Sequence, residues 1–310
     1  MAKKMVVLGS FVVDLMGRAP GLPVAGETVK GGYFKLGPGG KGSNQAVAAC
    51  KAGAEVLMIT KLGTDFFGDI AFKCFTDVGI DTRHVLRTDE SSTGAALIMV
   101  DAKTGQNIIL VVPGACEQIE LQQIESARDS IENASVLLTQ LETNFAPIEL
   151  AVDIAHSKRV PIILNPAPIQ GLPEALLQKV YVLTPNEVEA AALSGIEVKT
   201  PLDASRAAEA LMRMGVRNVI ITMGQQGAYV ASADKQQMLP GIRVNAIDAT
   251  GAGDAFSGGL AAAISEGLEL FDAARFAMAT AALSVTKIGT APAMPTRVEI
   301  DALLQIQGWN

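Results

Sequence analysis

The chain has 310 residues, of which 49% are hydrophobic and 18% charged, and this composition excludes a disordered protein and allows one large α/β domain. The net charge is -7 and Lys and Arg form no cluster, which excludes nucleic acid as a partner. No apolar stretch approaches the roughly 20 residues that a membrane-spanning helix needs, so we expect no membrane contact.

The N-terminal part of the chain predicts a buried strand, an excursion, a helix and a second strand. The apolar run Met5–Leu8 predicts the buried strand and is too short for a signal peptide. Residues 14–34 are rich in Gly and Pro and contain extended pieces such as Thr28–Phe34, which indicates an excursion from the main sheet. The Ala-rich run Ser43–Ala54 predicts the helix, and Val56–Leu62 predicts the second strand.

A hairpin pattern predicts a second excursion. Two extended runs, Thr93–Val100 and Ile108–Val112, flank a turn that contains Gly105. We expect the two excursions, roughly residues 12–36 and 93–112, to join into one small β-sheet.

From Leu121 onward strands and helices alternate, which predicts a mostly parallel sheet with helices on both faces. No linker divides the chain, so we expect a single three-layer α/β domain over residues 1–310. Residues 251–287 predict two Ala-rich helices around a break at Gly267. The other strands are expected at Val136–Gln140, Pro161–Asn165, Val180–Thr184 and Val219–Thr222, and the other helices at Pro147–Ser157, Asn186–Ser194 and Asp203–Met214.

Three cysteines, Cys50, Cys74 and Cys116, are widely spaced and odd in number. This pattern argues against a disulfide framework and against a zinc site of C-x-x-C geometry. Such cysteines are typical of thiols in a reducing compartment, and we expect a cytoplasmic protein.

The stretch KLGPGGKGSNQAVA contains a G-x-G-x-x-G pattern at Gly37, Gly39 and Gly42. A dinucleotide-binding loop should follow the first core strand, but this match lies about 30 residues later. A triphosphate-binding loop needs Ser or Thr after its Lys, whereas Gly42 follows Lys41. The pattern therefore disfavours both readings, although an NAD-dependent oxidoreductase remains an alternative.

A second glycine cluster, DATGAGDAFSGGL from Asp248 to Leu260, indicates an anion site. Gly251, Ala252 and Gly253 stand where a helix is about to start, and amides at a helix N-terminus favour a phosphoryl group. Asp254, in the first turn, would lie within reach of an attacking hydroxyl. Either half alone is typical of an ordinary glycine-rich cap; together they predict a phosphoryl-transfer site.

The two glycine motifs resemble the two signatures of the ribokinase-like, or phosphofructokinase-B, family of sugar and nucleoside kinases. The resemblance covers nearly the whole chain and implies a small β lid, formed by the two excursions, that closes over the sugar. The further matching segments, in family order, are Gly26-Glu27-Thr28, Gln140-Leu141-Glu142, Asn165-Pro166-Ala167-Pro168, Thr184-Pro185-Asn186-Glu187-x-Glu189 and Thr222-x-Gly224-x-x-Gly227.

The resemblance implies roles for individual residues. Asp254 is expected to be the general base, and Gly251, Ala252 and Gly253 the anion hole. ATP is the expected phosphoryl donor, Mg²⁺ the expected metal and K⁺ a further expected ion. The expected sugar-binding residues are Val12, Asp14, Gly39, Gly40, Lys41, Asn44, Glu142 and Asp254; those for ATP are Asn186, Thr222, Gly224 and Gly227; those for Mg²⁺ are Asn186 and Glu189; and those for the monovalent cation are Asp248, Thr250 and Gly289.

Two departures from the family pattern bear on the ligands. Ribose kinases of the family typically read G-S-x-N-x-D after the first strand, whereas Gly9–Asp14 reads G-S-F-V-V-D and places Val12 at the Asn position. Val cannot bond a 2-hydroxyl, so the sequence favours 2-deoxy-D-ribose, phosphorylated on its 5-hydroxyl. Ala293 stands where a Ser is often found near the cation site.

Alternatives remain open at this stage. The chain could act on D-ribose or on another small sugar or nucleoside, with Val12 only packing under the lid. A non-catalytic sugar or nucleotide sensor is the alternative of another class. We expect a homodimer in which the lids pair edge to edge.

Overall fold

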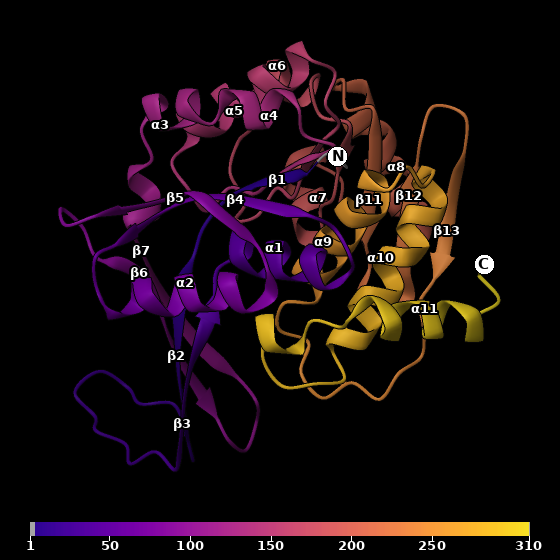
Figure 1. Cartoon of the computed structure of the whole chain (residues 1–310). Helices are drawn as coiled ribbons and strands as arrows, with labels where there is room; N and C mark the ends of the chain where they lie inside the picture. Colours follow the sequence, from indigo (N-terminus) through magenta and orange to yellow (C-terminus); the bar gives the residue numbers. More distant parts are fainter. Residues whose placement is uncertain (1–3, 310) are drawn as a thin grey trace.

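A nine-stranded sheet forms the centre of residues 4–309, the part of the chain that this computed structural model describes (Figure 1). Neighbouring strands from β5 to β11 pair in parallel, and β12 and β13 add an antiparallel edge. The strand order is β13-β12-β11-β10-β9-β8-β1-β4-β5. The strands are β1 (Met5–Leu8), β4 (Val56–Gly63), β5 (Asp81–Thr88), β8 (Leu137–Thr139), β9 (Ile162–Leu164), β10 (Val182–Leu183), β11 (Asn218–Thr222), β12 (Gly227–Ala231) and β13 (Gln236–Pro240).

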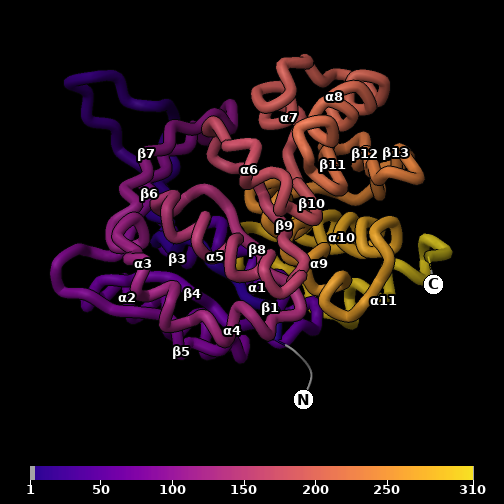
Figure 2. Tube along the Cα trace, turned by 90° about the horizontal axis from the view of Figure 1, so that it is seen from above, coloured from indigo at the N-terminus to yellow at the C-terminus, as the bar shows by residue number. Residues whose placement is uncertain are grey.

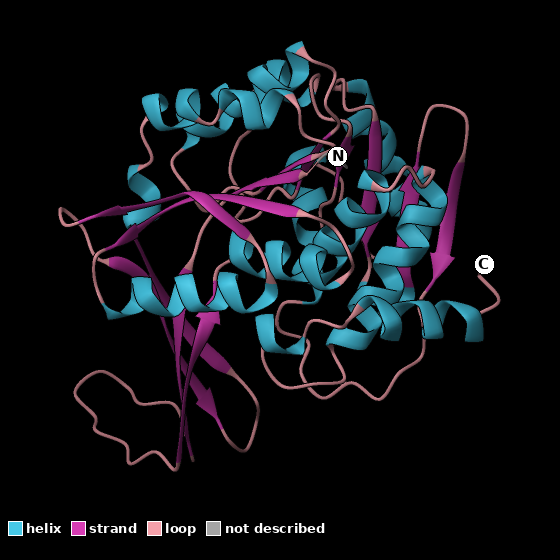
Figure 3. Ribbon diagram, viewed as in Figure 1, coloured by secondary structure: helices cyan, strands magenta, loops and turns pink. Residues whose placement is uncertain are grey.

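Helices cover both faces of the sheet because its inner strands are apolar on both sides (Figures 1 and 3). In β1, Met5 and Val7 face one core cluster and Val6 and Leu8 face the other. The first cluster packs under α1 (Lys41–Lys51), α2 (Phe66–Val78), α9 (Ala252–Ser265), α10 (Leu270–Ser284) and α11 (Arg297–Ile306); the second packs under α3 (Leu121–Ser126), α4 (Arg128–Glu132), α5 (Phe145–Ser157), α6 (Glu174–Leu177), α7 (Glu187–Ser194) and α8 (Pro201–Arg213).

A separate four-stranded sheet projects from the body, at the lower left of Figure 1, and the view from above in Figure 2 again places it at one end. Its order is β3-β2-β6-β7, and β2 follows directly from the end of β1. We call this sheet the lid sheet. Its strands are β2 (Val12–Ala19), β3 (Tyr33–Gly39), β6 (Thr93–Asp101) and β7 (Asn107–Gly114).

The predicted fold class, a mostly parallel α/β sheet with a small second sheet, is confirmed. Residues 1–3 and 310 of the expected single domain lie outside the described residues. No helix within residues 4–309 is long and apolar enough to cross a bilayer.

Some elements differ from the sequence prediction. The extended piece expected at Thr28–Phe34 begins only at Tyr33, because pairing with β2 starts there, opposite Arg18. The helix expected from Ser43 begins at Lys41, and the strand expected at Val180–Thr184 is reduced to Val182–Leu183. The sequence did not predict α2, β5, β12, β13 or α11.

Candidate active site

A polar pocket opens at the carboxyl ends of the parallel strands, where ligands bind in open α/β sheets. Residues that follow β9, β10 and β11 form one wall, and the N-terminus of α9 forms another. The lining residues are Lys41, Asn165, Ala167, Thr184, Asn186, Glu189, Thr222, Gly251, Gly253, Asp254 and Ser257.

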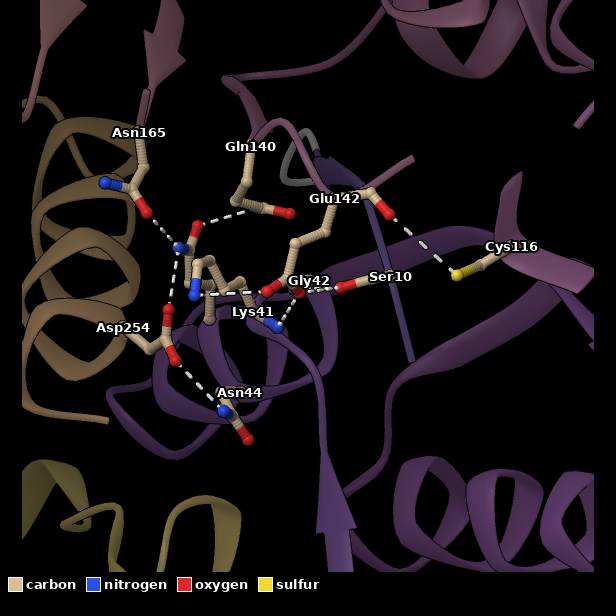
Figure 4. A network of polar contacts seen from close by, with 10 residues as sticks. Ser10, Lys41, Gly42, Asn44, Cys116, Gln140, Glu142, Asn165 and Asp254 are labelled. Atoms are coloured by element: carbon tan, nitrogen blue, oxygen red, sulfur yellow. Dashed lines mark hydrogen bonds and ion pairs between the residues drawn. The ribbon is translucent and has the colours of Figure 1, made fainter. Parts of the chain in front are cut away.

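Asp254 lies in the first turn of α9 and is 9% exposed. Its Oδ2 accepts a hydrogen bond from Asn44 Nδ2 at 2.9 Å, and its Oδ1 accepts one from Gln45 Nε2 at 3.0 Å (Figure 4). Burial raises the pKa of Asp254, while the Lys41 ammonium and the two amides oppose the rise. The carboxylate is thus a buried proton acceptor that faces the pocket.

The start of α9 supplies amides to the same pocket. Gly251 adopts a left-handed conformation, with φ 78°, that turns the chain into the helix. The amide of Ala252 donates to the Ala249 carbonyl at 3.2 Å, so this member of the expected anion hole is engaged. The amides of Gly253 and Asp254 have no backbone partner within residues 4–309, as expected for the first turn of a helix. The amides of Gly253 and Asp254 are therefore the ones at this helix start that remain open to a ligand.

Lys41 and Glu142 form an ion pair at the pocket, with 3.1 Å between Lys41 Nζ and Glu142 Oε1. Glu142 Oε2 also accepts hydrogen bonds from the Lys41 backbone amide at 2.9 Å and from Ser10 Oγ at 2.5 Å (Figure 4). Burial opposes the charged lysine, but the Glu142 and Asp254 carboxylates raise its pKa. Lys41 is therefore a fixed positive charge beside Asp254.

Asn186 and Glu189 form a capping box at the start of α7. Asn186 Oδ1 accepts the Glu189 amide at 2.8 Å, and Glu189 Oε2 accepts the Asn186 amide at 2.9 Å. Both residues line the pocket, and Glu189 is 8% exposed, so it is not a surface carboxylate. Burial raises the pKa of Glu189. Thr222 is joined to Asn186 by an isolated β-bridge, whereas Gly224 lies in the following turn and Gly227 begins β12, both outside the pocket lining.

A second pocket lies between the lid sheet and the body. Asp14 on β2 lies beside Gly39 there, and its pKa is raised to about 6 by burial and by the Glu142 and Asp254 carboxylates. The lining residues are Asp14, Met16, Arg18, Lys35, Gly37, Pro38, Ile98, Val100, Gly105, Asn107, Ile109, Asp248, Thr250, Gly289, Thr290 and Pro292.

The expected cation-site residues meet at this second pocket. Asp248 accepts the Thr250 amide through Oδ1 and the Gly289 amide through Oδ2, both at 3.0 Å. Burial raises the pKa of Asp248, but these hydrogen bonds outweigh it and hold the pKa below its usual value. Ala293 is buried and supplies no side-chain oxygen.

Val12 is the first residue of β2 and is 5% exposed. Because side chains alternate along a strand, it lies on the same face of β2 as Asp14. It pairs with Gly94 on β6, where an added Cβ would come within 2.8 Å of Val12 Cγ1. Gly40, with φ 86°, precedes α1 and connects this region to Lys41.

Sequence reasoning missed Gln45, Gln140 and the side chain of Asn165 as members of the site. Gln45 follows Asn44 in the chain, and Gln140 and Asn165 each begin one of the segments that resemble the kinase family. Their adjacency to functional residues was the available signal, but their contacts depend on the fold.

Known proteins resemble this chain over its full length. Residues 2–297 match the family described as pfkB family carbohydrate kinase. The ribokinase of Haemophilus influenzae is 40% identical over 299 residues, which cover 96% of this chain and 97% of that protein. The deoxyribokinase of Salmonella typhi is 35% identical over 301 residues, covering 97% and 98%. The structure of Arabidopsis thaliana ribokinase complexed with ribose and ATP has a TM-score of 0.91 at 30% identity, covering 98% of this chain and 99% of that one.

Proposed function

The chain belongs to the pfkB family of carbohydrate kinases, and from that premise we propose that it transfers the γ-phosphoryl group of ATP to the 5-hydroxyl of 2-deoxy-D-ribose. D-ribose or another small sugar or nucleoside is the alternative substrate. The observation that carries the proposal is the buried Asp254 carboxylate next to the open amides of Gly253 and Asp254. The kinase relatives act as ribokinases and deoxyribokinases, which supports a pentose as substrate.

The proposed reaction needs one proton acceptor and several fixed positive groups. The sugar hydroxyl gives its proton to Asp254 while its oxygen bonds the γ-phosphorus, and the bond from that phosphorus to the bridging oxygen of ADP breaks. The Gly253 amide and the Lys41 ammonium stabilise the charge on the transferring group. The lid sheet excludes water, which limits hydrolysis of ATP.

The sugar would lie between Asp14 and Asp254. Asn44 Oδ1 is buried and has no hydrogen-bond partner within residues 4–309, so a sugar hydroxyl can donate to it. Gly39 and Gly40 would line the sugar site with their backbone, because a Cβ at Gly39 would collide with the Asp14 carboxyl and one at Gly40 with the backbone of Phe11 and Val12. Glu142 would accept from a further hydroxyl.

ATP and its metal would bind on the side of Asn186. Asn186, Thr222, Gly224 and Gly227 would contact ATP, and Asn186 and Glu189 would hold Mg²⁺ through water and phosphate. Both residues line the pocket, and Mg²⁺ is typically bound through one or two carboxylates together with water and phosphate. Bound Mg²⁺ would neutralise charge on the phosphates.

K⁺ would be held by oxygen atoms of Asp248, Thr250 and Gly289, three residues that hydrogen bonds to the Asp248 carboxylate bring together. Oxygen ligands of this type suit a hard cation. The cation would add positive charge near the start of α9. A cytoplasmic location is part of the proposal, because the reaction consumes ATP and the three cysteines are free thiols.

The enzyme is also proposed to form a homodimer through the lid sheet. β7 is an edge strand, and five consecutive apolar residues of it, from Ile108 to Val112, are each 46–60% exposed. An exposed apolar edge strand associates readily, and pairing with a second copy would cover it.

The catalytic proposal is tested with Asp254→Asn, which keeps the shape and removes the base. We expect kcat to fall by at least about 10² to 10⁴-fold with any pentose. The measurement is ADP formation over a panel of pentoses. Turnover that survives the substitution would refute Asp254 as the base, and a wild-type protein without product from any sugar would favour the sensor alternative.

The sugar is tested by comparing kcat/KM for D-ribose and 2-deoxy-D-ribose in the wild-type enzyme and in Val12→Asn. Burying a 2-hydroxyl against Val12 leaves it without a partner, a penalty of about 1–3 kcal/mol, or roughly 5 to 150-fold. We expect the wild type to prefer 2-deoxy-D-ribose and the variant to shift toward D-ribose. An unchanged ratio would show that Val12 only packs under the lid.

A further inference from the structure

Side chains that follow three neighbouring strands meet next to Asp254. Gln140 comes directly after β8, Asn165 directly after β9 and Thr184 directly after β10, and these strands are adjacent in the sheet. The three residues therefore lie side by side at the carboxyl edge. Gln45 of α1 contacts this row and is 0% exposed.

The hydrogen bonds of this row run in one direction. The Thr184 carbonyl can only accept, and it takes a hydrogen bond from Asn165 Nδ2 at 3.1 Å. Asn165 must then present its oxygen to Gln45 Nε2, at 3.0 Å. Gln45 in turn presents its own oxygen to Gln140 Nε2, at 2.7 Å (Figure 4). We call Gln45, Gln140 and Asn165 the amide relay.

This direction decides what Gln45 offers to Asp254. The same Nε2 group donates to Asp254 Oδ1 at 3.0 Å, so an N–H faces that carboxylate oxygen. A flipped Gln45 amide would place its oxygen against two acceptors, Asp254 Oδ1 and Asn165 Oδ1. The relay thus prevents the flip, since buried polar groups left unpaired are costly.

We propose that the amide relay positions the Asp254 carboxylate and keeps it ready to accept the proton of the sugar hydroxyl. The proposal rests on the function proposed above. Gln45 and Gln140 do not belong to the pocket lining, so they are positioning residues. Asn44, the neighbour of Gln45 in α1, donates a hydrogen bond to the other oxygen, Oδ2.

Other charged groups also face Asp254 and must be kept constant in any test. Lys41 on α1 favours its ionised form, and Glu142 after β8 opposes it. Asp14 on β2 and Glu189 on α7 lie close enough to interact with its charge as well. The test therefore changes only uncharged side chains.

The test replaces Gln45 with Met, which has a similar shape but donates no hydrogen bond. Loss of the donor and of the fixed geometry should lower kcat by about 10- to 100-fold. It should also move the acidic limb of the pH profile of kcat/KM to higher pH, because the ionised carboxylate loses a hydrogen bond. The KM for ATP should change little. A folded Gln45→Met enzyme with the wild-type pH profile overturns the proposal.

A second variant, Gln140→Met, tests the relay itself. It leaves the contact between Gln45 and Asp254 in place but removes the donor to the Gln45 oxygen, so the Gln45 amide is held less firmly, and we expect a smaller loss of kcat with the same direction of pH shift. The double variant should be no worse than Gln45→Met alone, because Gln140 acts only through Gln45. Losses that add in the double variant overturn the relay. If Gln45→Met does not fold, the pH profile of Gln140→Met decides alone.

Thr60→Val is the matched control, because it also replaces a buried polar side chain by an apolar one of similar shape. Thr60 is 0% exposed, and its Oγ1 has no hydrogen-bond partner within residues 4–309. We expect this variant to have the kcat and the pH profile of the wild type. A shifted pH profile in Thr60→Val would mean that the readout is not specific, and the relay would lose its support.

Asp254→Asn separates the two proposals. If Asp254→Asn is fully active, Asp254 is not the base and the proposed function is refuted. If Asp254→Asn is inactive but Gln45→Met has the kcat and pH profile of the wild type, only the relay is refuted.

Discussion

The Asp14 carboxyl, which we propose binds the sugar, is expected to lower the stability of the fold at neutral pH. Its pKa is raised from 3.8 to about 6, first by burial and then by the Glu142 and Asp254 carboxylates. At a pH between these two pKa values, Asp14 is protonated in the folded protein and ionised in the unfolded chain. Stability therefore falls as the pH rises from about 4 to about 6, and the loss persists at higher pH.

Asp14→Asn is accordingly expected to stabilise the protein at pH 8. The substitution removes a buried charge, so the free energy of unfolding should rise by about 1–3 kcal/mol, and this gain should vanish near pH 4. Chemical denaturation at the two pH values measures it. Asp234→Asn, on an exposed turn, is the control and should change stability by less than about 0.5 kcal/mol at either pH. A loss of stability at pH 8 would contradict the assigned shift.

The same residue predicts a pH dependence of sugar binding. The ionised Asp14 would accept hydrogen bonds from the sugar, so the KM for the sugar should rise as the pH falls through about 6. Initial rates over a range of sugar concentrations between pH 5 and 8 measure this. A KM for the sugar that stays constant over that range would contradict a sugar-binding role for Asp14.

Also at the residue scale, the sequence predicts the identity of the candidate site residues more completely than the contacts between them. Asp254 and Asn44 were singled out from separate motifs, but their hydrogen bond joins residues 210 positions apart. Gln45 carries no motif of its own, and its role depends on the order of β8, β9 and β10. Contacts of this kind follow from topology and have no local sequence pattern.

At the scale of elements, local signals explain what was predicted. Apolar runs and Ala-rich segments revealed β1, β4, α1 and the pair α9 and α10. α2 was missed although Asp65 caps its start and Gly79, with φ 84°, ends it. β13 was missed for a different reason, because it is mostly exposed and carries the polar sequence QQMLP without regular alternation.

The two ends of α9 offer a matched pair of substitutions. Gly251 precedes the helix with φ 78°, and Gly267 follows it with φ 91°, so Ala at either position adopts a left-handed conformation that costs about 1–2 kcal/mol. We expect both substitutions to destabilise the protein, Gly251→Ala somewhat more, because its Cβ would lie 3.3 Å from Thr290 Cγ2 whereas a Cβ at Gly267 meets nothing within 4 Å. Only Gly251→Ala should lower kcat, because it disturbs the amides at the pocket. Thermal unfolding and initial rates measure the two effects, and equal kcat values in both variants would argue against an anion site at the start of α9.

At the scale of the whole molecule, the lid sheet is the part whose stability and function depend on its surroundings. It joins the first core cluster through Val13 of β2, with Leu15 packed against that cluster, and it lines the second pocket through Asp14, Lys35 and Ile109. Its contact with the body includes the hydrogen bond from Thr290 Oγ1 to the Pro38 carbonyl, at 3.0 Å. In the proposed kinase the lid sheet would close the sugar site, and in the proposed dimer a second copy would cover its exposed edge strand β7.

A charge placed on this edge tests the proposed dimer. Leu110 on β7 is 60% exposed and does not line the second pocket, so Leu110→Lys should leave the folded monomer intact. At the lid–lid interface the buried charge would be unpaired, and the dimer should dissociate. Sedimentation velocity over a range of concentrations measures the oligomeric state. Val298→Lys, at a 78% exposed site on α11, should leave the dimer unchanged. A Leu110→Lys protein that stays dimeric, or a wild-type protein that is monomeric, would show that another surface or no partner covers β7.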